Sequence, residues 1–134
     1  MKQHLKWKWN DNKSLKSELE RAQECRIEYK KRLNNELFYN PHWHLGQSLT
    51  TQSFKIDKYN FSYYIDFGVF CETDIDLIFN SYFLIQGYGY LNRTCLYETK
   101  TIPGNDEINF ISLEESKNLC EKHFIENFIK QFKG

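Results

Sequence analysis

The sequence predicts an α+β protein: an antiparallel sheet of about five strands, with a long helix from the N-terminal half and a C-terminal helix packed on one face. The first observation is a strand pattern, because apolar residues alternate with mixed ones from Phe61 to Cys71 and alternate residues of a strand point the same way. The second is a pair of helical patterns, which begin at Ser14 and Ser112. The third is length, since 134 residues that are 40% hydrophobic suffice for one core. We therefore expect a single domain over residues 1–134.

The chain opens with a short strand followed by a helix. Leu5, Trp7 and Trp9 alternate with lysines, which is typical of a strand at a sheet edge. From Ser14 onward a three-to-four-residue spacing predicts a long amphipathic helix whose buried stripe comprises Leu15, Leu19, Ala22, Cys25, Arg26, Tyr29, Leu33 and Leu37. Residues 40–46 are expected to form a loop, because Pro41 cannot continue the helix.

The middle of the chain is predicted to be β-structure. Strands are expected at residues 49–57, 60–72, 77–88 and 94–102, with polar breaks between them that suit antiparallel hairpins. Pro103-Gly104-Asn105-Asp106 is a strong turn signal, and residues 108–111 are expected to form another short strand. Ser112 and Glu115 have the spacing of a capping box, so a helix with a broad apolar face should begin there.

The cysteines and the N-terminus bear on compartment. Cys25, Cys71, Cys95 and Cys120 form no C-x-x-C pair and have no histidine at ligand spacing, so we expect reduced thiols and no structural zinc. The N-terminus lacks the apolar stretch of a secretory signal, and no run of about 18 apolar residues occurs. The sequence therefore predicts a cytoplasmic protein without a membrane partner.

Signatures of catalysis and nucleic-acid binding are weak. His42 and His44 form an H-x-H pair, but two histidines alone are more often structural than metal-binding, so we expect no metal and no cofactor. There is no G-x-S-x-G elbow, and Gly87-Tyr88-Gly89 lacks the glycine or lysine of a phosphate loop, so we assign no catalytic residues and expect no enzyme. The aromatic strands lie in an acidic part of the chain, which argues against a nucleic-acid partner.

Charge is unevenly spread although the net charge is zero. Residues 1–45 carry ten basic and six acidic side chains, whereas residues 57–115 carry three basic and ten acidic ones. Within the acidic part, Glu72, Asp74 and Asp76 gather at one predicted turn, and Asp66 lies on the strand before it. The cluster is either a solvated hairpin tip or half of an electrostatically steered interface.

We therefore expect a small protein-binding module with an acidic, aromatic recognition face. The residues assigned to this face are Tyr64, Asp66, Phe70, Glu72, Asp74, Asp76 and Tyr82. The partner would be a protein with a basic surface, and a bacterial immunity protein that occludes the active site of a nuclease-like toxin domain fits this size and charge. The alternative is a small-molecule-binding protein or enzyme with an aromatic pocket near His42 and His44, and a homodimer also remains open.

Overall fold

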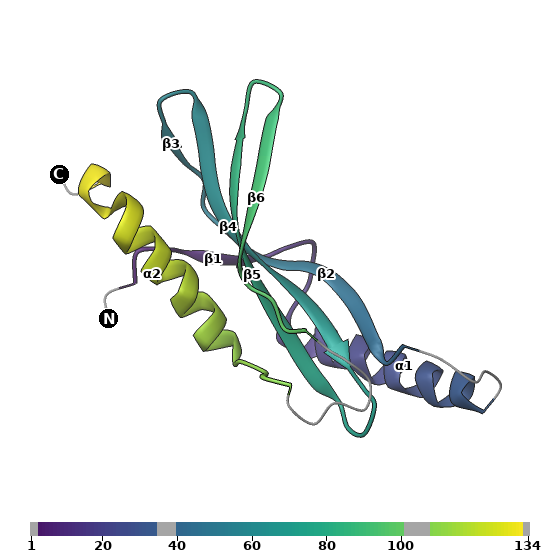
Figure 1. The fold of residues 1–134 in the computed structure, drawn as a ribbon. Helices are drawn as coiled ribbons and strands as arrows, with labels where there is room; N and C mark the ends of the chain where they lie inside the picture. Colours follow the sequence, from purple (N-terminus) through teal and green to yellow (C-terminus); the bar gives the residue numbers. More distant parts are fainter. Residues whose placement is uncertain (1–2, 35–39, 101–107, 133–134) are drawn as a thin grey trace.

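The computed structural model describes residues 3–34, 40–100 and 108–132, and it confirms the predicted α+β fold with an antiparallel sheet and two helices (Figure 1). The elements in chain order are β1 (Trp7–Trp9), α1 (Leu15–Leu33), β2 (His42–Thr51), β3 (Phe54–Ile56), β4 (Tyr59–Phe70), β5 (Asp76–Gly87), β6 (Tyr90–Tyr97) and α2 (Leu113–Phe132).

The sheet has the strand order β1-β2-β4-β5-β6, and all of its pairs are antiparallel. β2 and β3 lie on the same side of β4, where β3 pairs with its first residues and β2 with the remainder. The pairing of β4 with β5 is the longest, running without a shift from Asn60 opposite Gln86 to Phe70 opposite Asp76. This uninterrupted register keeps every second side chain of the two central strands on one side.

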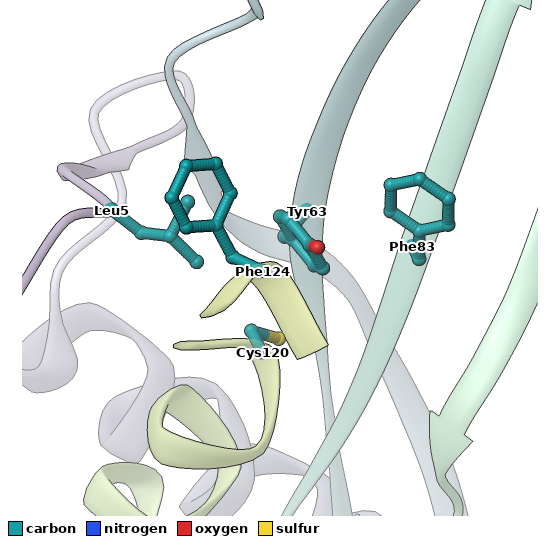
Figure 2. Packing of buried hydrophobic residues seen from close by; sticks show 5 residues of the cluster. All are labelled: Leu5, Tyr63, Phe83, Cys120 and Phe124. Atoms are coloured by element: carbon teal, nitrogen blue, oxygen red, sulfur yellow. The ribbon is translucent and has the colours of Figure 1, made fainter. Parts of the chain in front are cut away.

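Both helices pack on the side of the sheet that carries Tyr63, Ile65, Phe67 and Val69. α1 packs against β2 and β4, where Ala22 and Tyr29 meet Val69 and Cys71, whereas α2 packs mainly against β5 (Figure 1). Under α2, Tyr63 and Phe83 lie on neighbouring strands and belong to one buried cluster with Leu5, Cys120 and Phe124, which Figure 2 shows on the Tyr63 side. The rings of Tyr63 and Phe83 are 5.0 Å apart, and such pairs contribute beyond the area they bury.

Helix ends follow the predicted capping chemistry. Ser112 and Glu115 form the expected capping box, in which the Glu115 amide donates to Ser112 Oγ at 3.1 Å and the Ser112 amide donates to Glu115 Oε1 at 3.3 Å. α1 has an equivalent box between Ser14 and Ser17. These side chains satisfy amides that have no partner within the first turn of a helix.

Some element predictions were wrong. Residues 42–46, which were expected in a loop, begin β2, and residues 108–111, which were expected to form a strand, have no regular structure. The last hairpin turns at Tyr88 and Gly89, so β6 begins four residues earlier than predicted. Leu37 and the turn signal at 103–106 lie outside the described residues.

None of the described helices combines sufficient length with sufficient apolar character to cross a bilayer. Cys25, Cys71, Cys95 and Cys120 are all free thiols. Burial raises the pKa of Cys120, which lies under α2, to about 12, so this thiol stays protonated and unreactive at neutral pH.

Candidate functional site

The candidate site is the side of the central sheet that faces away from both helices, called here the open face. On β4 it carries Ser62, Tyr64, Asp66, Gly68 and Phe70, which alternate with the core residues. The register places Tyr82 opposite Tyr64 and Asp76 opposite Phe70, so β5 adds residues 76, 78, 80, 82 and 84. Five of the seven predicted recognition residues therefore share this face: Tyr64, Asp66, Phe70, Asp76 and Tyr82.

A stacked tyrosine pair lies at the centre of the open face. The rings of Tyr64 and Tyr82 are 4.9 Å apart and inclined by only 12°. Tyr64 is 1% exposed, and Arg93 on β6 donates to its hydroxyl at 3.4 Å, whereas Tyr82 is partly exposed. Burial raises the pKa of Tyr82 to about 12, with Cys95 and Asp66 adding to the shift, so its hydroxyl remains a neutral donor at physiological pH.

Asp66 lies two residues along β4 from Tyr64 and has basic side chains around it. Burial raises the pKa of Asp66, and His44, Arg93 and Lys13 act in the opposite direction. Lys13 is held in place because its Nζ donates to the carbonyls of Gln47 at 2.9 Å and Leu45 at 3.3 Å. The centre of the open face is therefore mixed in charge rather than purely acidic.

His42 and His44 lie on β2 at the same face, with ring centroids 4.9 Å apart. Gly68 makes room for them, since a Cβ there would lie 3.0 Å from the Trp43 carbonyl and 3.3 Å from His42 Nε2. Burial lowers the pKa of His42, His44 lowers it further, and Glu98 raises it. Among residues 3–34, 40–100 and 108–132, no three His, Cys, Asp or Glu side chains are arranged to hold a metal ion.

The predicted acidic cluster at the β4–β5 turn is divided between two sides of the molecule. Arg26 of α1 donates to Asp74 at 2.9 Å and to the Thr73 carbonyl at 3.0 Å. The Ile75 amide lowers the pKa of Asp74 most, and Arg26 lowers it further. Glu72 lies close enough to Tyr29 of α1 to raise its pKa, although burial is the larger cause. Of the three clustered acids, only Asp76 belongs to the open face.

The chain after β6 covers part of the open face beside β5. The Thr99 amide donates to Asn80 Oδ1 at 2.9 Å, and the ring of Phe110 is 6.2 Å from that of Phe70. Phe70 is buried as a result. Tyr64 and Phe70, which were predicted to contact a partner, are therefore buried beneath the surface of the open face. Of the predicted residues on this face, Asp66, Asp76 and Tyr82 remain partly exposed.

Sequence reasoning did not assign Arg93, Lys13 and Glu98 to this face. Arg93 fell in a predicted turn, although it lies on β6 opposite Leu84. Lys13 precedes α1 and Glu98 follows β6, so neither belongs to a strand whose alternation would place it. The alternation of β5, continued through a tight turn at Tyr88 and Gly89, would have placed Arg93 on the open face.

An apolar pocket of about 390 Å³ lies elsewhere, between the end of β6 and the first half of α2. Its lining residues are Tyr97, Ile111, Glu115, Asn118, Leu119 and Lys122. Neither His42 nor His44 contributes to it, so this pocket does not correspond to the aromatic pocket considered from the sequence.

In comparisons with known proteins, no protein-family description, no curated protein and no solved structure matches this chain. Functional inference therefore depends on the chemistry of the open face itself.

Proposed function

We propose that the protein is a binding module that uses the open face to cover a basic surface of a partner protein. The observation that carries the proposal is the Tyr64–Tyr82 stack beside Asp66 and Arg93, on the sheet face that neither α1 nor α2 covers. Tyrosine and arginine are the residue types that dominate protein interfaces, because they combine a large contact area with polar groups. Their position on strands, rather than loops, fixes them before a partner arrives.

Charge on the open face supports a partner with basic groups. Asp76 and Glu98 are acidic, and Asp66 is partly exposed between its cationic neighbours. A partner's lysine or arginine side chain could pair with Asp76 at the rim, while Tyr82 contacts its apolar stem. Asp74 has a different role in this proposal, because its contact with Arg26 ties α1 to the β4–β5 turn.

The instance that the charge pattern favours is neutralisation of a nuclease-like toxin domain in the bacterial cytoplasm. A nuclease binds nucleic acid through a basic groove, and a rigid sheet face with acidic residues at its rim suits occlusion of such a groove. In this mechanism the protein does no chemistry on its partner, because exclusion of substrate is sufficient.

The test is capture of binding proteins by the tagged protein and by three variants, one of them a control, followed by affinity measurement with the protein that is retained. Tyr82→Ala should weaken binding at least tenfold, because it removes a central aromatic contact. Asp76→Lys should slow association and reduce its dependence on salt. Glu126→Lys is the control, since it makes the same charge change at an exposed position of α2, on the helix side of the sheet.

The outcomes separate this proposal from the small-molecule alternative. A single protein that wild type and Glu126→Lys retain, and that Tyr82→Ala loses, would support recognition by the open face. Equal binding by all three variants would exclude the face. The specific observation behind the alternative is the contact between the rings of His42 and His44, so a metal or metabolite that copurifies with wild type and is lost from a folded His42→Ala, His44→Ala double variant would favour it.

A further inference from the structure

The edge strands β1 and β6 differ in how they are protected. β1 is three residues long and has Lys8 at its centre and Lys6 just before it, and short lysine-bearing strands resist pairing with other strands. β6 is eight residues long and carries a single charged side chain, Arg93. Among the residues that the structure describes, β5 is the only strand that pairs with β6, and Figure 1 shows β6 at the sheet edge.

The hairpin register identifies which backbone groups of β6 face outward. Tyr88 and Gly89 form a two-residue turn with φ of 49° and 76°, and the residues that flank such a turn exchange hydrogen bonds with each other. Tyr90, Asn92 and Thr94 therefore direct their amides and carbonyls toward β5. Leu91, Arg93 and Cys95 direct theirs toward the free edge. The register shift of this ladder begins only beyond Cys95.

Side chains of the same hairpin are unusually exposed for their size. Tyr88 is 84% exposed, Leu91 59% and Tyr90 47%, and the first six residues of β6 are all exposed. An exposed strand edge with apolar side chains beside it is a surface that natural proteins normally cover. Both the outward backbone groups and the exposed side chains of this hairpin are suited to pairing with a further strand.

We propose that two copies of the protein pair through β6, edge to edge and antiparallel, to form one continuous sheet. A two-fold axis perpendicular to the sheet keeps the same face outward in both copies. Because hydrogen-bonded pairs join residues whose backbone groups point outward, Leu91 and Arg93 of one copy must each lie opposite an odd-numbered residue of the other. A register that places Arg93 opposite Arg93 is disfavoured by like-charge repulsion.

The register with Asn92 on the two-fold axis avoids this repulsion. It places Arg93 opposite Leu91 of the second copy, where the aliphatic stem of arginine can cover the exposed leucine. It places Tyr90 opposite Thr94, and it does not reach the irregular end of the β5–β6 ladder. The second copy is favoured over an unrelated strand because this pairing satisfies the charge, the apolar side chains and the outward backbone groups together.

Dimerisation through β6 would also change how the open face is presented to a partner. Arg93 and Cys95 lie on the open face, so pairing through β6 would join the open faces of two copies side by side. Tyr82→Ala leaves the outward groups of β6 unchanged, and it should therefore alter partner binding without altering the dimer.

The first test is sedimentation of the full-length protein over a wide range of concentration. Wild type should convert from monomer to dimer at roughly 10 μM, because about seven paired residues form a small interface. Leu91→Pro removes an outward amide that β5 does not use, so it should fold and remain monomeric at every concentration. Leu91→Ala keeps this amide and should still dimerise. Wild type that is monomeric throughout, or Leu91→Pro that still dimerises, would overturn the proposal.

A second measurement does not depend on how proline is tolerated. In a Cys95→Ser background, Asn92→Cys would bring two thiols together on the axis at a pair whose Cα atoms are about 4.5 Å apart, which a disulfide can bridge. Mild oxidation should give a covalent dimer. Thr94→Cys in the same background is the matched control and should remain uncrosslinked. Failure of Asn92→Cys to crosslink would contradict this pairing.

Discussion

Glu121 is a fully buried carboxylate on α2 that fixes the N-terminal segment. Its Oε1 accepts hydrogen bonds from the amides of His4 and Leu5, the latter at 3.1 Å, and its Oε2 lies 3.7 Å from His4 Nδ1. A buried charge is tolerated where it is paired and hydrogen-bonded, and here the bonds reach across 116 residues of sequence. Glu121 therefore ties the approach to β1 to the opposite end of the chain.

Removing this carboxylate should be costly. We expect Glu121→Ala to lower the free energy of unfolding by about 3 kcal/mol, because it leaves two amides without an acceptor. Glu121→Gln keeps one acceptor oxygen and should cost about 1 kcal/mol. Urea denaturation monitored by circular dichroism would measure both. Equal losses for the two variants would contradict this, because they would show that the amide oxygen of glutamine, in a side chain of nearly the same volume, does not replace the carboxylate.

His123 gives stability a dependence on pH. Its Nδ1 is 2.7 Å from the hydroxyl of buried Tyr63, and its ring packs 4.7 Å from that of Phe83. Burial lowers the pKa of His123, and Glu126 opposes this shift. Since the pKa is lower in the folded than in the unfolded state, the unfolded chain binds more protons and stability decreases with falling pH.

The expected result is a loss of stability as the pH falls through about 6.5, the ordinary histidine value, toward the lower pKa of the folded state. The pKa of His42 is lowered in the same direction and should contribute to the slope. His123→Gln can still hydrogen-bond with Tyr63 and should make the profile shallower. Thermal unfolding between about pH 5 and 8 would measure this, and an unchanged slope in the variant would rule out titration of His123 as a cause.

At the scale of elements, the buried stripe predicted for α1 is confirmed at Ala22 and Tyr29 but is wrong for its leucines. Leu15, Leu19 and Leu33 are exposed, whereas Glu18, Ala22 and Tyr29 are buried. Ser48 Oγ donates to Glu18 at 3.0 Å, and Arg26 reaches the β4–β5 turn, so polar contacts with β2 and with that turn fix the rotation of the helix. The periodicity revealed a helix, but its partners lie about 30 and 48 residues away and leave no local signal.

This rotation leads to a prediction that separates neighbouring positions of α1. Leu19 is 41% exposed, so Leu19→Glu should change the free energy of unfolding by no more than about 0.5 kcal/mol. Ala22 is 0% exposed against Val69 and Cys71, so Ala22→Leu should cost about 1–3 kcal/mol through overpacking. Chemical denaturation would compare them. A larger loss of stability for Leu19→Glu than for Ala22→Leu would instead show that the leucine-bearing side of α1 is the buried one.

At the scale of the whole molecule, alternation along β4 predicted which side chains share a face, and the register with β5 agrees with it. Exposure was not predictable in the same way, because Arg93 and Phe110 contact Tyr64 and Phe70 from other parts of the chain. Asp74 likewise does not belong to the open face, because it pairs with Arg26 of α1. The face of the sheet on which a side chain lies follows from its position along the strand, whereas its burial depends on which other segments of the chain cover it.

The same distinction predicts how stability is distributed over the molecule. α2 packs Cys120 and Phe124 against Tyr63 and Phe83, whereas the side chains of residues 30–34 at the end of α1 are all exposed. Amides in the last turn of α1 should therefore exchange with solvent through local opening, and amides near Cys120 through global unfolding. Hydrogen exchange followed by mass spectrometry would resolve these segments.

Two variants show whether the tether to the β4–β5 turn limits this opening. Arg26→Ala removes the bonds to Asp74 and Thr73, so it should speed exchange in the second half of α1 and leave α2 unchanged. Lys30→Ala, on the exposed side of the same helix, is the control and should have little effect. Faster exchange throughout the molecule in Arg26→Ala would instead mean that α1 and α2 unfold as one cooperative unit, with the turn contact contributing to global stability.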